Sequence, residues 1–489
     1  MNLKHPSLFR QQCYVGGQWI DASDHETIPV VNPANGTHIG SVPCLTAQDV
    51  QAAIQAADDA LPAWRETSAK DRSKLMRRWY DLCMAHQEDL ATILTCEQGK
   101  PLSEARGEIA YGSAFIEWFS EEAKRVYGDV IPAASADRRI LVIKQPVGVV
   151  AAITPWNFPN AMITRKAGAA LAAGCTIVIK PASATPFSAL ALAALAIEAG
   201  IPPGVLNVVT GKASVVGGAL TSSPVVRKLS FTGSTEVGKT LMEQCARTVK
   251  KVSMELGGNA PFIVFSDADL DAAVAGVMAS KFRNAGQTCV CANRIFVQDD
   301  IYEVFAAKLK ATVEAQVVGD GMTDGVNLGP LIDAAAVEKV KEHIDDALGL
   351  GAKLLTGGQT HALGGHFFEP TILINVSPDS KLMREETFGP VAPLIAFSTE
   401  EEVIRMANDT PFGLAAYFYT DSYDRAWRVC EALECGIVGL NEGIISTELA
   451  PFGGIKESGV GREGSKYGIE DYMEIKYICA GGLGKKRAI

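Results

Sequence analysis

The sequence lacks the signatures of several protein classes. It contains no paired C-x-x-C motifs with the spacing of a zinc site, although 11 cysteines are scattered along it. Its opening residues, MNLKHPSLFR, lack the apolar core of a signal peptide. The most apolar run, Ala189 to Ile197, is about half as long as a membrane span. We therefore expect a reduced, cytoplasmic protein that requires no metal and has no membrane partner.

Basic residues are also fewer than acidic residues. The 489 residues include 45 Lys and Arg against 56 Asp and Glu, which gives a formal net charge of −11. An acidic surface of this kind argues against nucleic acid as the main partner, because nucleic-acid binding depends on basic patches. Hydrophobic residues make up 47% and charged residues 21%, as in ordinary globular proteins. The length predicts roughly three domains.

The pattern from Val147 onward predicts an α/β protein. Continuous apolar strands alternate with helices, which indicates a parallel sheet covered on both faces. A small ligand is expected at the carboxyl ends of such strands. A second α/β region is expected from about Asn259 to Gly443. The predicted strands of the first region are 148–154, 175–180, 205–211 and 227–233, and its predicted helices are 161–173, 186–199 and 236–248.

Two segments look like additions to this pattern. Residues 125–146 are predicted to form a hairpin, and residues 472–483 alternate between polar and apolar side chains like a strand. Two such appendages suggest strand pairing between subunits. The alternative is an edge hairpin within one subunit.

Three polar residues are candidates for catalysis. Cys289 ends the polar, glycine-bearing stretch NAGQTC, where a thiol of lowered pKa could act as a nucleophile; the alternative is an inert buried thiol. Glu255 has apolar flanks that suggest a dry carboxyl suited to general base catalysis; the alternative is a capping or ion-paired glutamate. Asn157 follows the first predicted strand and could donate to an oxyanion, or simply form an Asx turn.

A fourth candidate is the segment GSTEVG at 233–238, which follows a predicted strand and opens a helix. Backbone N–H groups at a helix start bind phosphate oxygens. The spacing is not G-x-G-x-x-G, so a plain strand-to-helix turn is the alternative.

Seven segments in chain order together resemble the aldehyde dehydrogenase superfamily: TPWNFP, KPASATP, FTGSTEVG, ELGGNAP, GQTC, EETFGP and PFGGIKESG. The resemblance extends from about Gln11 to Gly482. It implies an aldehyde dehydrogenase fold, which combines a variant Rossmann cofactor domain, an α/β catalytic domain and a β-hairpin oligomerisation arm. The implied division is 1–124 with 147–258 for the cofactor domain, 259–445 for the catalytic domain, and 125–146 with 468–489 for the arm.

The resemblance also implies a mechanism. Cys289 matches the nucleophile, Glu255 the general base, and Asn157 the side-chain half of the oxyanion hole. The thiolate attacks an aldehyde, hydride leaves to a nicotinamide cofactor, and Glu255 activates the water that hydrolyses the thioester. The positions that match the family's cofactor site are Trp156, Lys180, Ser183, Gly233, Ser234, Leu256, Glu386 and Phe388.

The segment KPASATP bears on the choice of cofactor. In the family, NAD-preferring members commonly have a glutamate three residues after the lysine, where it repels a 2′-phosphate. This sequence has Ser183 at that position, and Lys180 supplies a positive charge. We predict that NADP is preferred and NAD used poorly. The alternative is that both cofactors work.

Longer segments resemble the succinate-semialdehyde dehydrogenases in particular. In that subfamily two arginines and a serine hold the distal carboxylate of the substrate, and the matching positions are Arg165, Arg283 and Ser446. An arginine paired structurally with a glutamate is the alternative for either guanidinium, and Thr447 is the alternative to Ser446. Glutarate semialdehyde is one methylene longer, which a pocket distinguishes by only about 1–3 kcal/mol.

Further expectations follow from this resemblance. The enzyme would act in 4-aminobutyrate degradation, as a homodimer or homotetramer. Cys291 lies two residues after Cys289, and a reversible disulfide between them would inactivate the enzyme; the alternative is a packing thiol. A second interpretation keeps this chemistry and changes the substrate to another ω-carboxylated aldehyde or to an uncharged aldehyde. A remote alternative is a non-enzymatic structural protein on the same fold, against which the intact Cys289, Glu255 and Asn157 argue.

Overall fold

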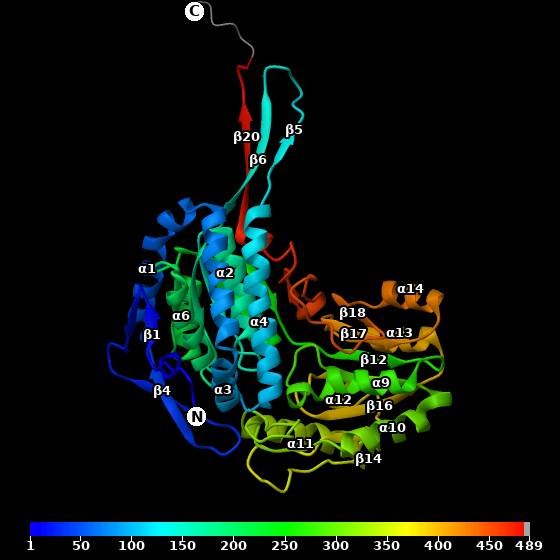
Figure 1. The fold of residues 1–489 in the computed structure, drawn as a ribbon. Coiled ribbons are helices and arrows are strands. Elements are labelled where there is room, and N and C mark those ends of the chain that lie inside the picture. Colours follow the sequence, from blue (N-terminus) through cyan, green and yellow to red (C-terminus); the bar gives the residue numbers. More distant parts are fainter. Residues whose placement is uncertain (484–489) are drawn as a thin grey trace, which may run out of the picture.

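Two large sheets organise the part of the chain that the computed structural model describes, residues 1–483 (Figure 1). The first has eight strands in the order β19-β11-β10-β7-β8-β9-β1-β2. Five of them, from β11 to β9, run parallel, while β19, β1 and β2 pair antiparallel at the two edges. Their bounds are Gly459–Val460 (β19), Lys251–Glu255 (β11), Val226–Thr232 (β10), Val149–Ile153 (β7), Thr176–Lys180 (β8), Leu206–Val208 (β9), Cys13–Val15 (β1) and Gln18–Ile20 (β2).

Helices cover both faces of this sheet. Alternate residues of β7 point in opposite directions, so Val150 and Ala152 pack in one apolar cluster and Val149 and Ala151 in another. The first cluster includes α2, α4, α5 and α6, and the second includes α1, α7 and α8. The predicted parallel sheet with two covered faces is therefore confirmed. The helices are Ala47–Glu66 (α1), Ala69–Ala85 (α2), Gln87–Gln98 (α3), Leu102–Glu122 (α4), Ala161–Ala173 (α5), Phe187–Ala199 (α6), Ala213–Ser222 (α7) and Thr235–Ala246 (α8).

The second sheet has seven strands in the order β14-β15-β16-β13-β12-β17-β18, all parallel to their neighbours except β14. Its strands are Lys353–Thr356 (β14), Thr371–Ile374 (β15), Val391–Phe397 (β16), Ala292–Gln298 (β13), Ala260–Val264 (β12), Ala415–Tyr419 (β17) and Ile437–Leu440 (β18). Its helices are Leu270–Val277 (α9), Tyr302–Glu314 (α10), Ala334–Gly349 (α11), Lys381–Arg384 (α12), Glu400–Asn408 (α13) and Tyr423–Ala432 (α14).

The two sheets are joined by a very short connection. Strand β11 of the first sheet ends at Glu255, and β12 of the second begins at Ala260. The intervening residues 256–259 belong to the ELGGNAP motif, so this motif lies where the two sheets meet. On its other edge β11 pairs with β19, with Glu255 opposite Gly459. A separate two-stranded sheet, Thr27–Val31 (β3) with His38–Pro43 (β4), lies near the start of the chain.

A three-stranded antiparallel sheet projects away from the rest of the molecule (Figure 1). It consists of β5 (Asp129–Ile131), β6 (Arg139–Pro146) and β20 (Met473–Ala480). The predicted hairpin and the predicted terminal strand are both confirmed, and they pair with each other in the same chain, from Met473 opposite Pro146 to Ala480 opposite Arg139. Residues 484–489, at the end of the predicted arm segment 468–489, lie outside the described residues.

No helix within residues 1–483 combines the length and hydrophobicity needed to cross a lipid bilayer. The division into a cofactor domain, a catalytic domain and an oligomerisation arm, with the boundaries given above, stays a prediction.

Candidate active site

A cavity of about 350 Å³ is lined by loops from both sheets. Its size is that of an ordinary small-molecule site. Its wall includes residues from the loops that follow β7 and β10, from the connection after β11, and from the Cys289 loop that precedes β13. The predicted residues in its wall are Trp156, Asn157, Gly233, Ser234, Leu256, Cys289, Glu386 and Phe388.

The backbone before Cys289 is unusual. Asn284 and Ala285 both have left-handed conformations, with φ of 52° and 54°, and such residues cost on the order of 1 kcal/mol or more each. The neighbouring Gly258 leaves no room for a side chain, because a Cβ there would lie 2.6 Å from the Cys289 carbonyl oxygen. The nucleophile candidate is therefore held by a tightly packed, strained loop.

The Cys289 thiol is not activated by its protein surroundings alone. Burial raises its pKa to about 12, with the Glu386 charge adding to the rise and the Arg165 and Arg283 charges opposing it. The thiol is protonated at neutral pH, so attack on an aldehyde requires a group that removes this proton.

Asn157 is fixed from several sides. Its side-chain Nδ2 donates to the Gln287 carbonyl at 3.0 Å, which leaves one of its two N–H groups for another acceptor. Its backbone carbonyl accepts from the Asn284 amide at 3.0 Å and from Lys100 Nζ at 2.8 Å. Lys100 in turn forms a fully buried ion pair with Glu108 at 2.6 Å. These contacts set the position of a hydrogen-bond donor in the cavity wall.

Glu255 ends strand β11 and is 3% exposed. Neither of its carboxyl oxygens has a hydrogen-bond partner among the described residues. Burial, followed by the charge of Glu463, raises its pKa well above the usual range, while Lys166 and Arg165 oppose the rise. A buried, unpaired carboxyl of raised pKa is typical of a functional site. Its side chain is not part of the cavity wall.

The sequence did not reveal the neighbours of Glu255. Glu463 is buried and forms ion pairs with Lys166 and, at 3.4 Å, with Arg165. One signal was available: Arg165 and Lys166 are adjacent cations in an otherwise apolar helix, and buried cations require an anion.

The predicted cofactor-binding residues in the cavity wall include the turn at the start of α8 and a pair of aromatic rings. Ser234 caps α8, its Oγ accepting from the Val237 N–H at 3.4 Å, and together with Gly233 it places the start of this helix at the cavity wall. The rings of Trp156 and Phe388 meet edge to face, with centroids 5.5 Å apart. Glu386 accepts from the Gly258 N–H at 3.1 Å, and burial raises its pKa to about 7.

Lys180 and Ser183 lie outside the cavity wall. Lys180 ends β8 beside β7, and its Nζ donates to the Pro181 carbonyl at 3.1 Å. Burial lowers its pKa to about 8, and within residues 1–483 it forms no ion pair. Ser183 is half-buried in the turn that follows. A buried ammonium without an anion, close in sequence to a free hydroxyl, fits a phosphate group.

The two arginines differ in their surroundings. Arg165 is 1% exposed and already paired with Glu463, so the alternative of a structural pair is realised for this residue. Arg283 forms no ion pair within the described residues, its Nε has no partner, and its guanidinium lies 5.3 Å from the centre of the Phe158 ring. Both charges lower the pKa of Cys289, so both guanidiniums lie near the nucleophile candidate.

The hydroxyl groups of Ser446 and Thr447 face different partners. The Thr447 hydroxyl donates to Glu448 at 3.3 Å and accepts from the Leu449 N–H. Ser446 instead lies near Tyr111, where its hydroxyl lowers the pKa of the phenol, and Tyr111 accepts a hydrogen bond from Arg165. Of the two residues, Ser446 is therefore the one beside the arginines.

Cys291 is buried and lies beside a lysine. Lys281 Nζ donates to its Sγ at 3.4 Å, and the thiol also contacts the Lys281 carbonyl oxygen at 3.5 Å. Burial raises the pKa of Cys291 and the Lys281 charge opposes the rise. A disulfide with Cys289 would require the Cys291 side chain to leave this contact, and its formation stays a prediction.

The comparisons with known proteins identify the family. The sequence model described as "Aldehyde dehydrogenase family" matches residues 19–478. The chain belongs to the aldehyde dehydrogenase family. The predicted family and the predicted aldehyde dehydrogenase fold are thus confirmed, whereas the roles of individual residues stay predictions.

Several family members with high similarity act on semialdehydes, as their names state. "Succinate-semialdehyde dehydrogenase [NADP(+)] GabD" of Escherichia coli is 65% identical, over 98% of this chain and 100% of the relative. "Glutarate-semialdehyde dehydrogenase" of Pseudomonas aeruginosa is 64% identical, over 99% and 100%. The crystal structure of succinate-semialdehyde dehydrogenase from Burkholderia pseudomallei superposes with a TM-score of 0.98 at 60% identity, covering 98% of this chain and 100% of that one.

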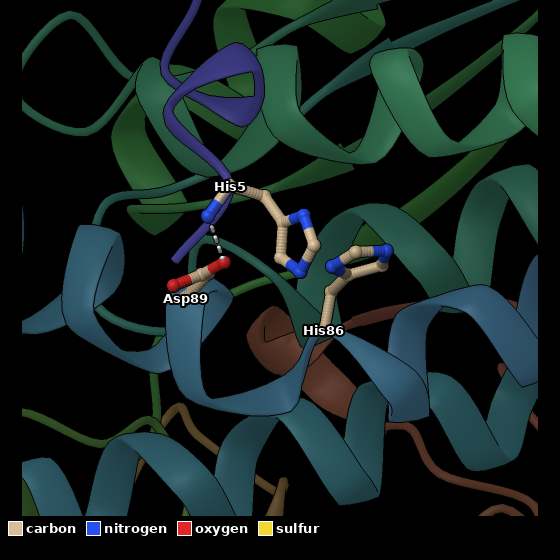
Figure 2. A group of neighbouring side chains, drawn as sticks. All are labelled: His5, His86 and Asp89. Atoms are coloured by element: carbon tan, nitrogen blue, oxygen red, sulfur yellow. Dashed lines mark hydrogen bonds between the residues drawn. The ribbon is translucent and has the colours of Figure 1, made fainter. Parts of the chain in front are cut away.

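A cluster of three side chains, all of types that can bind a metal ion, comes from residues far from this site in the sequence. Ligand atoms of His5, His86 and Asp89 lie within 4.8 Å of one another (Figure 2). Both Asp89 oxygens already accept backbone N–H groups, from Lys4 at 2.8 Å and from His5 at 2.9 Å. The two imidazole rings pack edge to face at 4.4 Å. These contacts fasten the start of the chain to the first turn of α3, and the absence of a metal from the enzyme stays a prediction.

Proposed function

We propose that this aldehyde dehydrogenase oxidises succinate semialdehyde to succinate with NADP. The observation that carries the proposal is the Arg283 guanidinium, which lies beside the Phe158 ring and forms no ion pair within residues 1–483. Arg165 already has Glu463 as its anion, but a second cation beside an apolar reaction site is costly unless a further anion joins it. A carboxylate at the far end of a short aldehyde supplies that anion.

Each of the predicted catalytic residues has its own role in the reaction. Cys289 passes its proton to a solvent water molecule, and its sulfur forms a bond to the aldehyde carbon. The free N–H of Asn157 donates to the resulting oxyanion, an interaction typically worth about 3 kcal/mol. The nicotinamide cofactor, when bound, accepts the hydride. Glu255 then takes a proton from the water that hydrolyses the thioester, and its raised pKa makes it a stronger base than an ordinary carboxylate.

NADP is proposed over NAD because of Lys180 and Ser183. The Lys180 ammonium has no carboxylate partner in the described part of the chain, and the serine carries no charge that would repel a 2′-phosphate. The relative from Escherichia coli, named as an NADP(+) enzyme, supports this choice.

The decisive experiment compares substrates. We would measure kcat/KM for succinic semialdehyde, glutaric semialdehyde and butanal, each with NADP and with NAD. The proposal requires a strong preference for succinic semialdehyde with NADP. Equal values for butanal would overturn the carboxylate pocket, and equal values for NAD would overturn the cofactor assignment.

Glutarate semialdehyde is the second candidate substrate. The 64% identical relative from Pseudomonas aeruginosa carries that name, and one methylene changes binding by only about 1–3 kcal/mol. The same experiment ranks the two substrates. An enzyme that prefers succinate semialdehyde would serve 4-aminobutyrate degradation.

Self-association through the projecting three-stranded sheet is also proposed. Its apolar side chains Val130, Ile475 and Tyr477 are 74%, 71% and 61% exposed, and exposed apolar patches mark interaction sites. We expect a homodimer or homotetramer. Light scattering of the intact chain and of an Ile475→Asp variant tests this, and a monomeric wild type would contradict it. The cytoplasmic location stays a prediction.

A further inference from the structure

Tyr111 lies on α4, among residues predicted to form the substrate pocket. Its ring packs edge to face on Phe115, with centroids 5.2 Å apart, and against the small apolar cluster that contains Phe158 and Met162. Phe158 is also the ring beside Arg283. Tyr111 therefore lines the same apolar space as the second arginine.

The Tyr111 hydroxyl is the polar partner of Arg165. Arg165 Nη2 donates to the phenolic oxygen, while Nη1 pairs with Glu463 at 3.4 Å. The Arg165 guanidinium also lies between aromatic rings, 4.7 Å from the centre of Phe115 and 4.8 Å from that of Phe452. With 1% of its surface exposed, Arg165 is enclosed by these partners, and Tyr111 is the one that carries a hydroxyl group.

Other groups converge on the same oxygen. Burial raises the pKa of the Tyr111 phenol, and the charges of Arg165 and Arg283 together with the nearby Ser446 hydroxyl oppose the rise. A thiolate at Cys289 would raise it further, so Tyr111 also lies near the nucleophile candidate. The phenol is thus at the meeting point of all the predicted substrate contacts.

The direction of the hydrogen bonds defines what Tyr111 offers. A guanidinium only donates, so the phenolic oxygen must be the acceptor from Arg165. The O–H proton is then available for an acceptor in the pocket. Donation from Arg165 withdraws charge from the phenol and strengthens its O–H as a donor.

We propose that the Tyr111 hydroxyl donates a hydrogen bond to the distal carboxylate of the substrate beside Arg283, and that Arg165 acts through Tyr111 as a positioning residue. This inference rests on the proposed function, because it requires a substrate with a distal anion. It assigns Tyr111 to substrate specificity and leaves the chemical step to Cys289, Asn157 and Glu255.

The variant Tyr111→Phe tests the proposal, since it removes the hydroxyl and keeps the ring that packs on Arg165. A hydrogen bond to a charged group typically contributes about 1.5–3 kcal/mol, so KM for succinic semialdehyde should rise about 10- to 100-fold. The kcat with this substrate and kcat/KM for butanal should change by less than about twofold. Tyr423→Phe, which alters an exposed tyrosine on α14, is the matched control.

A binding measurement separates recognition from catalysis. Succinate, as a competitive inhibitor, should lose affinity for Tyr111→Phe by a factor similar to that for KM, whereas 1-butanol, which carries no charge, should not. Equal losses for the charged and uncharged ligands would overturn the role of Tyr111, because a structural defect affects both. A wild-type enzyme that does not distinguish succinic semialdehyde from butanal would instead overturn the proposed function, and the role of Tyr111 with it.

Discussion

The pKa of Lys180 leads to a quantitative prediction about NADP binding. Burial lowers this pKa to about 8, so about nine-tenths of the free protein carries the Lys180 charge at pH 7 and about one-tenth at pH 9. If only the charged form binds the 2′-phosphate, the apparent dissociation constant scales with the inverse of that fraction. The affinity for NADPH should therefore fall about tenfold between pH 7 and pH 9.

The cofactor itself contributes little to this change. The second pKa of a phosphate monoester is about 6, so the 2′-phosphate keeps its full charge over the whole range. NADH lacks this phosphate, and its dissociation constant should change much less. Binding of NADPH near pH 8.5 should also take up protons, because the phosphate restores the charge on Lys180.

Fluorescence titration of NADPH and NADH at several pH values measures both constants. Lys180→Arg keeps a charge at every pH and should abolish the pH dependence, while Lys180→Met should bind NADPH weakly throughout. Lys353→Met, a change at an exposed lysine of β14, is the control. An NADPH affinity that stays constant from pH 7 to pH 9, or that falls in parallel with that of NADH, would refute the reasoning.

Three further predictions concern other parts of the site. Glu255→Gln should still release one equivalent of reduced cofactor per site in stopped-flow experiments, while steady-state turnover falls about 10²- to 10⁴-fold; an absent burst would contradict a role confined to hydrolysis. Lys100→Met should lower the free energy of unfolding by about 3–5 kcal/mol, because Glu108 loses its buried partner. Thermal unfolding should show partial recovery in the double variant Lys100→Met/Glu108→Leu, and a single variant as stable as wild type would exclude the argument. Cys291→Ala should abolish the part of peroxide inactivation that dithiothreitol reverses, and unchanged reversibility would reject the disulfide.

Local sequence pattern was enough to predict the centre of the first sheet. The helix predicted at 161–173 has these bounds in the structure, and the strand predicted at 175–180 is observed at 176–180. Both segments are rich in apolar residues and are followed directly by Gly174 and Pro181, so the boundaries are encoded locally.

The edges of the sheet could not be predicted in the same way. The strand predicted at 205–211 pairs only over 206–208. Val209 still donates to Ile179 of β8, but at Thr210 the backbone turns to another partner, since its carbonyl accepts from the Leu45 N–H. Its antiparallel neighbour is Tyr14, about 190 residues earlier in the chain. Such pairings depend on tertiary contacts that no local window contains.

The candidate site shows the same division. Motifs located Cys289 and Glu255, because their neighbours in sequence are distinctive. Tyr111 has no motif: its role depends on Arg165, which is 54 residues away in the chain. Likewise Glu463 meets Lys166 across 297 residues. Residues that act through distant partners require coordinates to be found.

The pairing of β11 with β19 has a consequence for how this protein is made. Glu255 lies on β11, and its strand neighbour Gly459 follows about 200 residues later. At roughly 5–20 residues per second, synthesis of that interval takes about 10–40 s. During this time the edge of β11 is open to any passing strand. The segment with the general base candidate is therefore exposed in the nascent chain and needs protection, and slowing translation between β11 and β19 should lower the soluble yield more than slowing it after β19.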